Sequence, residues 1–247
     1  MTKISHTIKN YVVSTKTPLY SLVFTLPLFF IYELGIIFAN TNDLISLRNG
    51  ADSILRETLE IFGIFGFYGI GAIFLLSAIL VFLFHKKYLH EIFFKIDYLF
   101  LMMVESFFWS ILLFLFMSFI LKNSHLLILG NHSKILMQQV ILSVGAGIYE
   151  ELVFRVFLIA VISVMVGFVF QWKGTLKNWL AMVISASLFS YFHFVGEFGD
   201  WFSFDIFVIR FFAGIALGSL YFIRGFGITA WTHSIYDLIV LTNNTTQ

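Results

Sequence analysis

The chain has 247 residues, no cysteine and a formal net charge of +1, so disulfides, thiolate zinc sites and cysteine nucleophiles are excluded. Hydrophobic residues make up 60% of it and charged residues only 12%, with a mean hydropathy of +0.93. Soluble domains carry about 25% charged residues, so this composition indicates a polytopic membrane protein, and the near-neutral charge predicts no nucleic-acid partner.

Apolar stretches of roughly 17 to 25 residues, long enough to cross a bilayer, follow one another along the chain. They fall near residues 19–39, 61–84, 98–121, 146–170, 179–195, 204–223 and 226–242. Residues 135–145 either extend the fourth stretch or form a separate helix before the glycines at 145 and 147. We therefore predict an all-α fold, a polytopic membrane helix bundle of seven to eight transmembrane helices, as a single integral-membrane domain over residues 1–247.

The first apolar stretch is too long for a signal-peptide core and has no small-residue cleavage site after it, so we expect a retained helix. Most lysines and arginines of the connecting segments fall on the side that holds the N-terminus. The positive-inside rule then predicts a cytoplasmic N-terminus, in the plasma (inner) membrane if the source is prokaryotic. Membrane lipid is the expected surrounding partner.

The stretch GIYEELVFRVFL, residues 147–158, places ionisable side chains inside an apolar run. Glu151 and Arg155 are i, i+4 neighbours on one helical face and are placed to pair, whereas Glu150 is rotated by roughly 100° and has no local partner. One interpretation is a buried ion-pair network that holds helices together. Against it, a structural network would be expected to balance its charge, and Glu150 is left over.

Two further motifs follow in the second half of the chain. In LFSYFHF, Phe189 and His193 lie one helical turn apart, and in WTHSIYDL, His233 and Asp237 are again i, i+4 neighbours. Each motif alone is also compatible with a structural hydrogen bond. Together with Glu150 they supply a base that can activate water and donors for the oxyanion formed when water attacks a carbonyl. The residues therefore indicate a water-activating hydrolase inside the membrane.

The order EELVFR, FSYFH, HSIYD resembles the EExxxR, FxxxH and HxxxN/D motifs of the CAAX-processing and bacteriocin-processing family of intramembrane proteases, which includes Rce1-type CAAX prenyl endopeptidases and bacterial Abi proteins. This resemblance implies that Glu150 is the water-activating base, assisted by His193, and that His233 with Asp237 stabilises the oxyanion. Glu151, Arg155 and Phe189 are implied to be supporting residues. The motifs lie within residues 145–240, and residues 1–134 are expected to be mainly scaffold helices.

The resemblance implies an endopeptidase that cleaves a prenylated (CAAX) or other lipidated or hydrophobic peptide or protein. Many relatives carry Asn where this chain has Asp237, so we expect Asp237 to orient and charge His233, which is then the donor. We predict that no cofactor or metal is needed, because the H-E-x-x-H spacing is absent; zinc is the alternative, since Glu and His are zinc ligands.

The competing class of function is non-catalytic: a membrane scaffold, an immunity or regulatory partner, or a transporter. A transporter would be expected to show internal repeats, and none is visible in the sequence. Three more acidic residues lie in or near apolar stretches. We expect Glu33 and Asp97 at the membrane interface, while Glu105 is deep enough to lie behind the candidate site.

Overall fold

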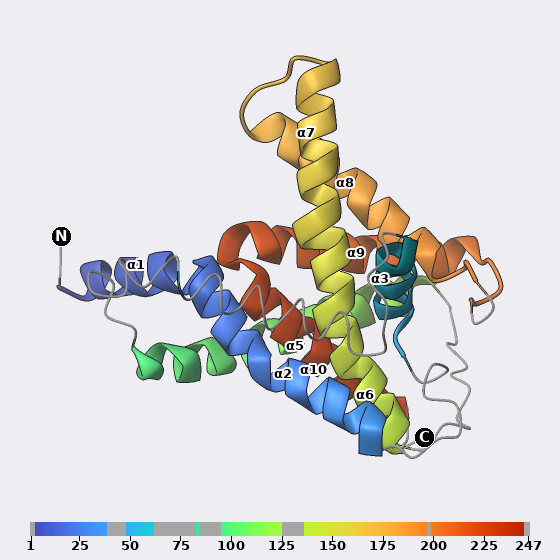
Figure 1. Ribbon diagram of the computed structural model, residues 1–247, viewed down its shortest axis with the longest axis horizontal. Coiled ribbons are helices and arrows are strands. Elements are labelled where there is room, and N and C mark those ends of the chain that lie inside the picture. The colour runs from blue at the N-terminus through green and yellow to red at the C-terminus, as the bar shows by residue number, and fades with distance from the viewer. Residues whose placement is uncertain are drawn as a thin grey trace.

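The computed structural model describes residues 3–38, 48–61, 83, 95–124, 136–196 and 199–244, and every regular element in these ranges is helical (Figure 1). This confirms the all-α prediction for the described part of the chain. The elements are α1 (Lys3–Thr15), α2 (Pro18–Phe38), α3 (Gly50–Ile61), α5 (Ile96–Ser124), α6 (Leu136–Gly145), η1 (Ala146–Glu150), η2 (Leu152–Leu158), α7 (Ile159–Val169), α8 (Thr175–Phe192), α9 (Phe204–Arg224) and α10 (Phe226–Asn244).

Among the described helices, 4 are long and apolar enough to cross a membrane: Pro18–Phe38, Ile96–Leu121, Met137–Val169 and Phe204–Arg224. The predicted spans 179–195 and 226–242 are present as α8 and α10, but α8 carries several serines and α10 carries His233 and Asp237, which lower their hydropathy. The predicted span 61–84 lies, apart from residues 61 and 83, outside the described residues. The number of seven to eight spans therefore stays a prediction.

The segment from α6 to α7 is one continuous helix, which runs through the middle of the molecule in Figure 1. Its apolar part, Met137–Val169, has 33 residues and at 1.5 Å per residue is about 50 Å long, which exceeds the hydrocarbon thickness of about 30 Å. The described part of residues 135–145, Leu136–Gly145, thus extends the fourth span and does not form a separate helix. The middle of this helix, η1 and η2, is wound as π-helix, a rare geometry that is frequent at functional sites.

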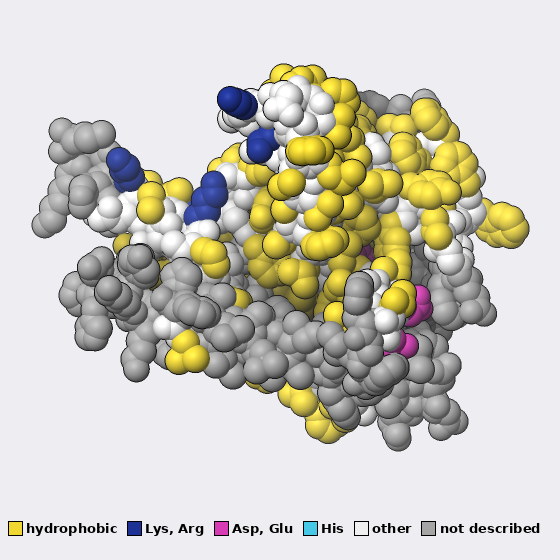
Figure 2. All heavy atoms as spheres, turned by 45° about the horizontal axis from the view of Figure 1, so that its top comes forward, with side chains coloured by type: hydrophobic (Ala, Val, Ile, Leu, Met, Phe, Trp, Pro, Cys, Tyr) yellow, Lys and Arg dark blue, Asp and Glu magenta, His cyan; other side chains and the backbone are white. Residues whose placement is uncertain are grey.

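Neighbouring helices surround this long helix along its length. α2 and α10 pack against α6 and η1, while α8 packs against η2 and α7 and is itself covered by α9. The core between α2, α6 and η1 contains Tyr32, Ile148 and Tyr149, all fully buried. The outer side of α7 is different, because Figure 2 shows hydrophobic side chains gathered over the long helix, and Phe168 there is 79% exposed. Such a surface suits lipid contact.

Candidate active site

Glu150 is the last residue of η1 and is buried, with 5% of its surface exposed. Its Oε1 accepts a hydrogen bond from Nδ2 of Asn49 at 2.9 Å. Its Oε2 lies 4.0 Å from Nε2 of His193, which follows the end of α8. Glu150 therefore has no partner on its own helix, as predicted, but it contacts a residue 101 positions earlier in the chain.

Glu151 points to the other side of the helix and is fully buried. Its Oε2 lies 3.0 Å from Nε of Arg155, so the predicted i, i+4 ion pair is confirmed. Its Oε1 accepts a hydrogen bond from Nδ1 of His233 at 2.7 Å. The second carboxylate is therefore not only a partner for arginine, because it also connects the long helix to α10.

The third motif forms one turn of α10. Nε2 of His233 lies 3.6 Å from Oδ2 of Asp237, so this predicted i, i+4 pair is also close together. Since Nδ1 of His233 faces Glu151, the imidazole stands between two carboxylates. An imidazolium would donate from Nδ1 to Glu151, while Nε2 at 3.6 Å from Asp237 lies within ion-pair distance but beyond ordinary hydrogen-bond length.

The second motif brings Phe189 and His193 onto the same side of α8. Nδ1 of His193 lies 2.9 Å from the carbonyl oxygen of Phe189, and because a carbonyl only accepts, Nδ1 is the donor. In a neutral imidazole this leaves Nε2, the atom that faces Glu150, as an acceptor. The Phe189 ring lies between the two halves of the site, with the Arg155 guanidinium carbon 4.3 Å from its centroid and the His193 ring 5.0 Å away.

Gly147 lets α10 approach η1 closely enough for the bond between Glu151 and His233. A Cβ at Gly147 would lie 2.0 Å from Oγ of Ser234 and 2.4 Å from the carbonyl oxygen of Ala230. Small residues at such a crossing bring two helix backbones together. Because Glu151 lies one turn after Gly147, this contact also sets the distance from Glu151 to α10.

The sequence analysis missed Asn49, which lies just before α3 and supplies the only hydrogen bond that Glu150 makes within the described residues. No motif pointed to it, because an asparagine before a helix is usually read as an N-cap. Glu33 is buried and accepts hydrogen bonds from Arg56 and Tyr149, and its place at the membrane interface stays a prediction. Glu105 does not lie behind the site, because it pairs with Arg224, the last residue of α9.

An apolar groove of about 290 Å³ adjoins the site. It lies between α3, η2 and α8, and its walls include Phe154 and Phe192. The Phe192 ring is 6.0 Å from that of His193, so one end of the groove reaches the candidate site. Among the described residues, the lining consists of Ala51, Ile54, Val153, Phe154, Leu158, Leu188, Tyr191, Phe192 and Val195.

In the described part of the chain, no three His, Cys, Asp or Glu side chains are grouped so that they could hold a metal ion. Glu150 lies close to His193, and His233 lies close to Glu151 and Asp237. Independence from metal stays a prediction for the chelation experiment described below.

Comparison with known proteins tests the resemblance noted in the motifs. Residues 131–239 match the family model described as type II CAAX prenyl endopeptidase Rce1-like. No curated protein and no solved structure matched the chain. The matched range contains all three motifs, and with the apolar helices it supports an integral membrane protein with a protease role. Residues 131–239 are therefore similar to the Rce1-like type II CAAX prenyl endopeptidases, the family that the motifs resemble.

Proposed function

We propose that this protein is an intramembrane endopeptidase in which Glu150 activates water to hydrolyse a peptide bond. The observation that carries the proposal is the 4.0 Å separation between Oε2 of Glu150 and Nε2 of His193. Both atoms can accept hydrogen bonds, and a water molecule that donates to both would direct a lone pair away from them, toward a substrate carbonyl.

The proposed reaction has two steps that balance in protons. In the first, the water oxygen bonds to the carbonyl carbon while its proton passes to Glu150, which gives a tetrahedral oxyanion. In the second, the carbon–nitrogen bond breaks and Glu150 returns the proton to the leaving amine. The products are a carboxylic acid and an amine, which exchange a proton in water to give a carboxylate and an ammonium group, and the enzyme is regenerated.

His233 is the proposed donor to the oxyanion. Its Nδ1 is held by Glu151 at 2.7 Å, whereas Nε2 is 3.6 Å from Asp237, beyond ordinary hydrogen-bond length, and can donate elsewhere. The two carboxylates favour a positively charged ring, and a preorganised positive donor stabilises a developing oxyanion strongly. Asp237, which stands where many relatives carry Asn, is proposed to hold the positive charge on His233.

A hydrophobic or lipidated peptide is the proposed substrate. The groove lined by Phe154 and Phe192 is entirely apolar and ends next to His193, so an apolar side chain or lipid placed there would bring a neighbouring peptide bond toward Glu150. The match to the CAAX prenyl endopeptidases supports a prenylated peptide as the first substrate to test.

The test uses purified full-length protein in detergent with a fluorescence-quenched farnesylated CAAX peptide and the same peptide without the lipid. Glu150→Gln keeps the shape of the side chain but removes the base, and a general base contributes about 10²- to 10⁴-fold, so kcat should fall by that factor. Glu57→Gln, an exposed change on α3, is the matched control and should keep wild-type kcat.

Wild-type activity in Glu150→Gln would refute the mechanism. If the wild-type protein binds both peptides but cleaves neither, the proposed enzymatic function is refuted and a scaffold function is favoured.

A further inference from the structure

We propose that Asn49 is a positioning residue of the active site: it orients the Glu150 carboxylate so that Oε2 faces His193. This inference rests on the proposed function of Glu150. It concerns a residue outside the matched range 131–239, in the part of the chain expected to be scaffold.

The amide orientation of Asn49 follows from its two hydrogen bonds. Its side-chain oxygen, Oδ1, accepts from the backbone N–H of Ala51 at 2.9 Å, and a backbone N–H can only donate. The other side-chain atom, the donor Nδ2, is therefore the one that lies 2.9 Å from Oε1 of Glu150. With Oε1 fixed in this way, the second oxygen of the carboxylate is directed toward His193.

The backbone of Asn49 is also fixed. Its N–H donates to the hydroxyl of Tyr32 at 2.9 Å, and that hydroxyl donates to Oδ2 of Asp52 at 3.0 Å. Tyr32 and Asp52 are fully buried, so water does not compete for these bonds. The position of the Asn49 amide is thus set by α2 and α3 together.

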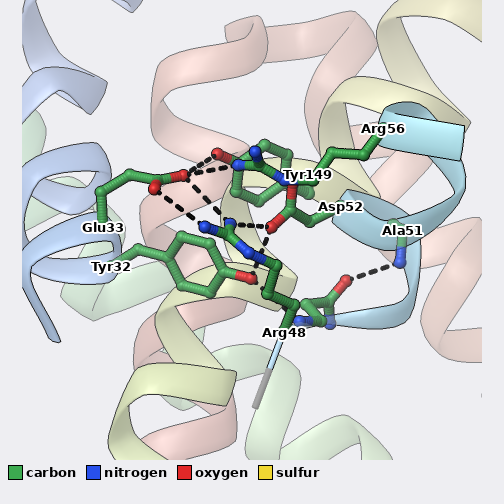
Figure 3. A network of polar contacts seen from close by, with 8 residues as sticks. Tyr32, Glu33, Arg48, Ala51, Asp52, Arg56 and Tyr149 are labelled. Atoms are coloured by element: carbon green, nitrogen blue, oxygen red, sulfur yellow. Dashed lines mark hydrogen bonds and ion pairs between the residues drawn. The ribbon is translucent and has the colours of Figure 1, made fainter. Parts of the chain in front are cut away.

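A buried charge network joins α2 to the start of α3 (Figure 3). Arg48 pairs with Asp52 at 2.6 Å, and Arg56 pairs with Glu33 at 3.0 Å and with Asp52 at 2.7 Å. Two arginines and two carboxylates balance, which is the condition under which buried ion pairs are retained. The network therefore holds the start of α3 against α2.

The same network reaches the helix that carries the base. Tyr149, the residue before Glu150, donates its hydroxyl to Oε1 of Glu33 at 2.9 Å and is fully buried. Two neighbouring residues of η1 thus bond to this part of the structure: Tyr149 bonds to Glu33 on α2, and Glu150 bonds to Asn49 just before α3. This explains how a π-helical segment, whose hydrogen bonding is less regular than that of an α-helix, can present Glu150 in one orientation.

Two substitutions separate this role from helix capping. Asn49→Asp and Asn49→Ser both keep an N-cap acceptor for α3. Aspartate has the shape of asparagine but no donor, and serine is too short to reach Glu150. Asn178→Asp is the matched control, since Oδ1 of Asn178 accepts from Ser163 on the outer part of the bundle and an aspartate can accept there too.

Loss of a hydrogen bond to a charged group changes an equilibrium by about 10- to 100-fold, so both Asn49 variants should lower kcat by about that factor. KM should stay within about twofold, because Asn49 contacts the base and not the substrate. The melting temperature should fall by no more than about 10 °C, because an unsatisfied buried acceptor costs about 1–3 kcal/mol, and Asn178→Asp should behave as wild type. Wild-type kcat in Asn49→Asp would overturn the proposal, as would a loss of activity matched by the loss of folded protein.

A second readout does not depend on cleavage. The infrared difference spectrum between wild type and Glu150→Gln isolates the Glu150 carboxylate band in the wild-type protein. The difference between Asn49→Ser and Asn49→Ser/Glu150→Gln isolates the same band in the absence of the Asn49 amide. The proposal requires the two band positions to differ, and identical bands would overturn it. If the wild-type protein cleaves no peptide, a band difference still supports the contact from Asn49 while the proposed function fails.

Discussion

Replacement of Gly147 by alanine tests whether the close crossing of η1 and α10 builds the site. The added Cβ would lie 2.4 Å from the carbonyl oxygen of Ala230 and 2.9 Å from the backbone nitrogen of Ser234. These are backbone atoms and cannot rotate away. Restoring an ordinary separation of about 3.5 Å moves one helix by about 1 Å.

A displacement of about 1 Å would lengthen the 2.7 Å hydrogen bond between Glu151 and His233 beyond hydrogen-bond range. Misplacement by 1 Å costs about 10²-fold in rate, and overpacking costs about 1–3 kcal/mol of stability, so Gly147→Ala should lower both kcat and the melting temperature.

The assay compares peptide cleavage and thermal unfolding with those of Gly167→Ala. Gly167 lies on the same long helix, but a Cβ there would meet mainly the flexible Lys177 side chain, at 3.3 Å. Wild-type activity and stability in Gly147→Ala would refute the reasoning, because they would mean that the helices need not approach so closely.

Three further predictions concern the chemistry of the site. Asp237→Asn should reduce kcat markedly, because an amide cannot hold a positive charge on His233, and retained activity would show that a neutral donor suffices. Phe189→Leu should lower the melting temperature and kcat together, since it removes an aromatic face worth about 0.5–2 kcal/mol to the Arg155 guanidinium, and an unchanged protein would contradict a role for this ring. Peptide cleavage should survive exhaustive chelation, whereas reversible loss that zinc restores would establish the zinc alternative.

Local geometry made much of the candidate site predictable. Glu151 with Arg155 and His233 with Asp237 are neighbours within one helix, and a helical repeat places residues four apart on one face. Both pairs are present, at 3.0 Å and 3.6 Å. The same reasoning correctly left Glu150 without a partner on its own helix.

The partners of the other buried acidic residues were not predictable from spacing. Glu33 and Glu105 have partners on other helices, Arg56 on α3 and Arg224 on α9, and which helices pack together depends on the fit of whole surfaces. The glycines at 145 and 147 left open a separate helix before them, whereas the helix continues there and Gly147 serves a helix crossing.

The sequence by itself determined the helical membrane class, the order of the three motifs and the contacts within single helices, because these follow from composition and from the period of the helix. Only the tertiary structure decided that His233 binds Glu151 and that Asn49 binds Glu150, across separations of 82 and 101 residues. Those distances are set by helix packing, by the close contact at Gly147 and by the buried charge network around α3, none of which has a periodic signature in the chain.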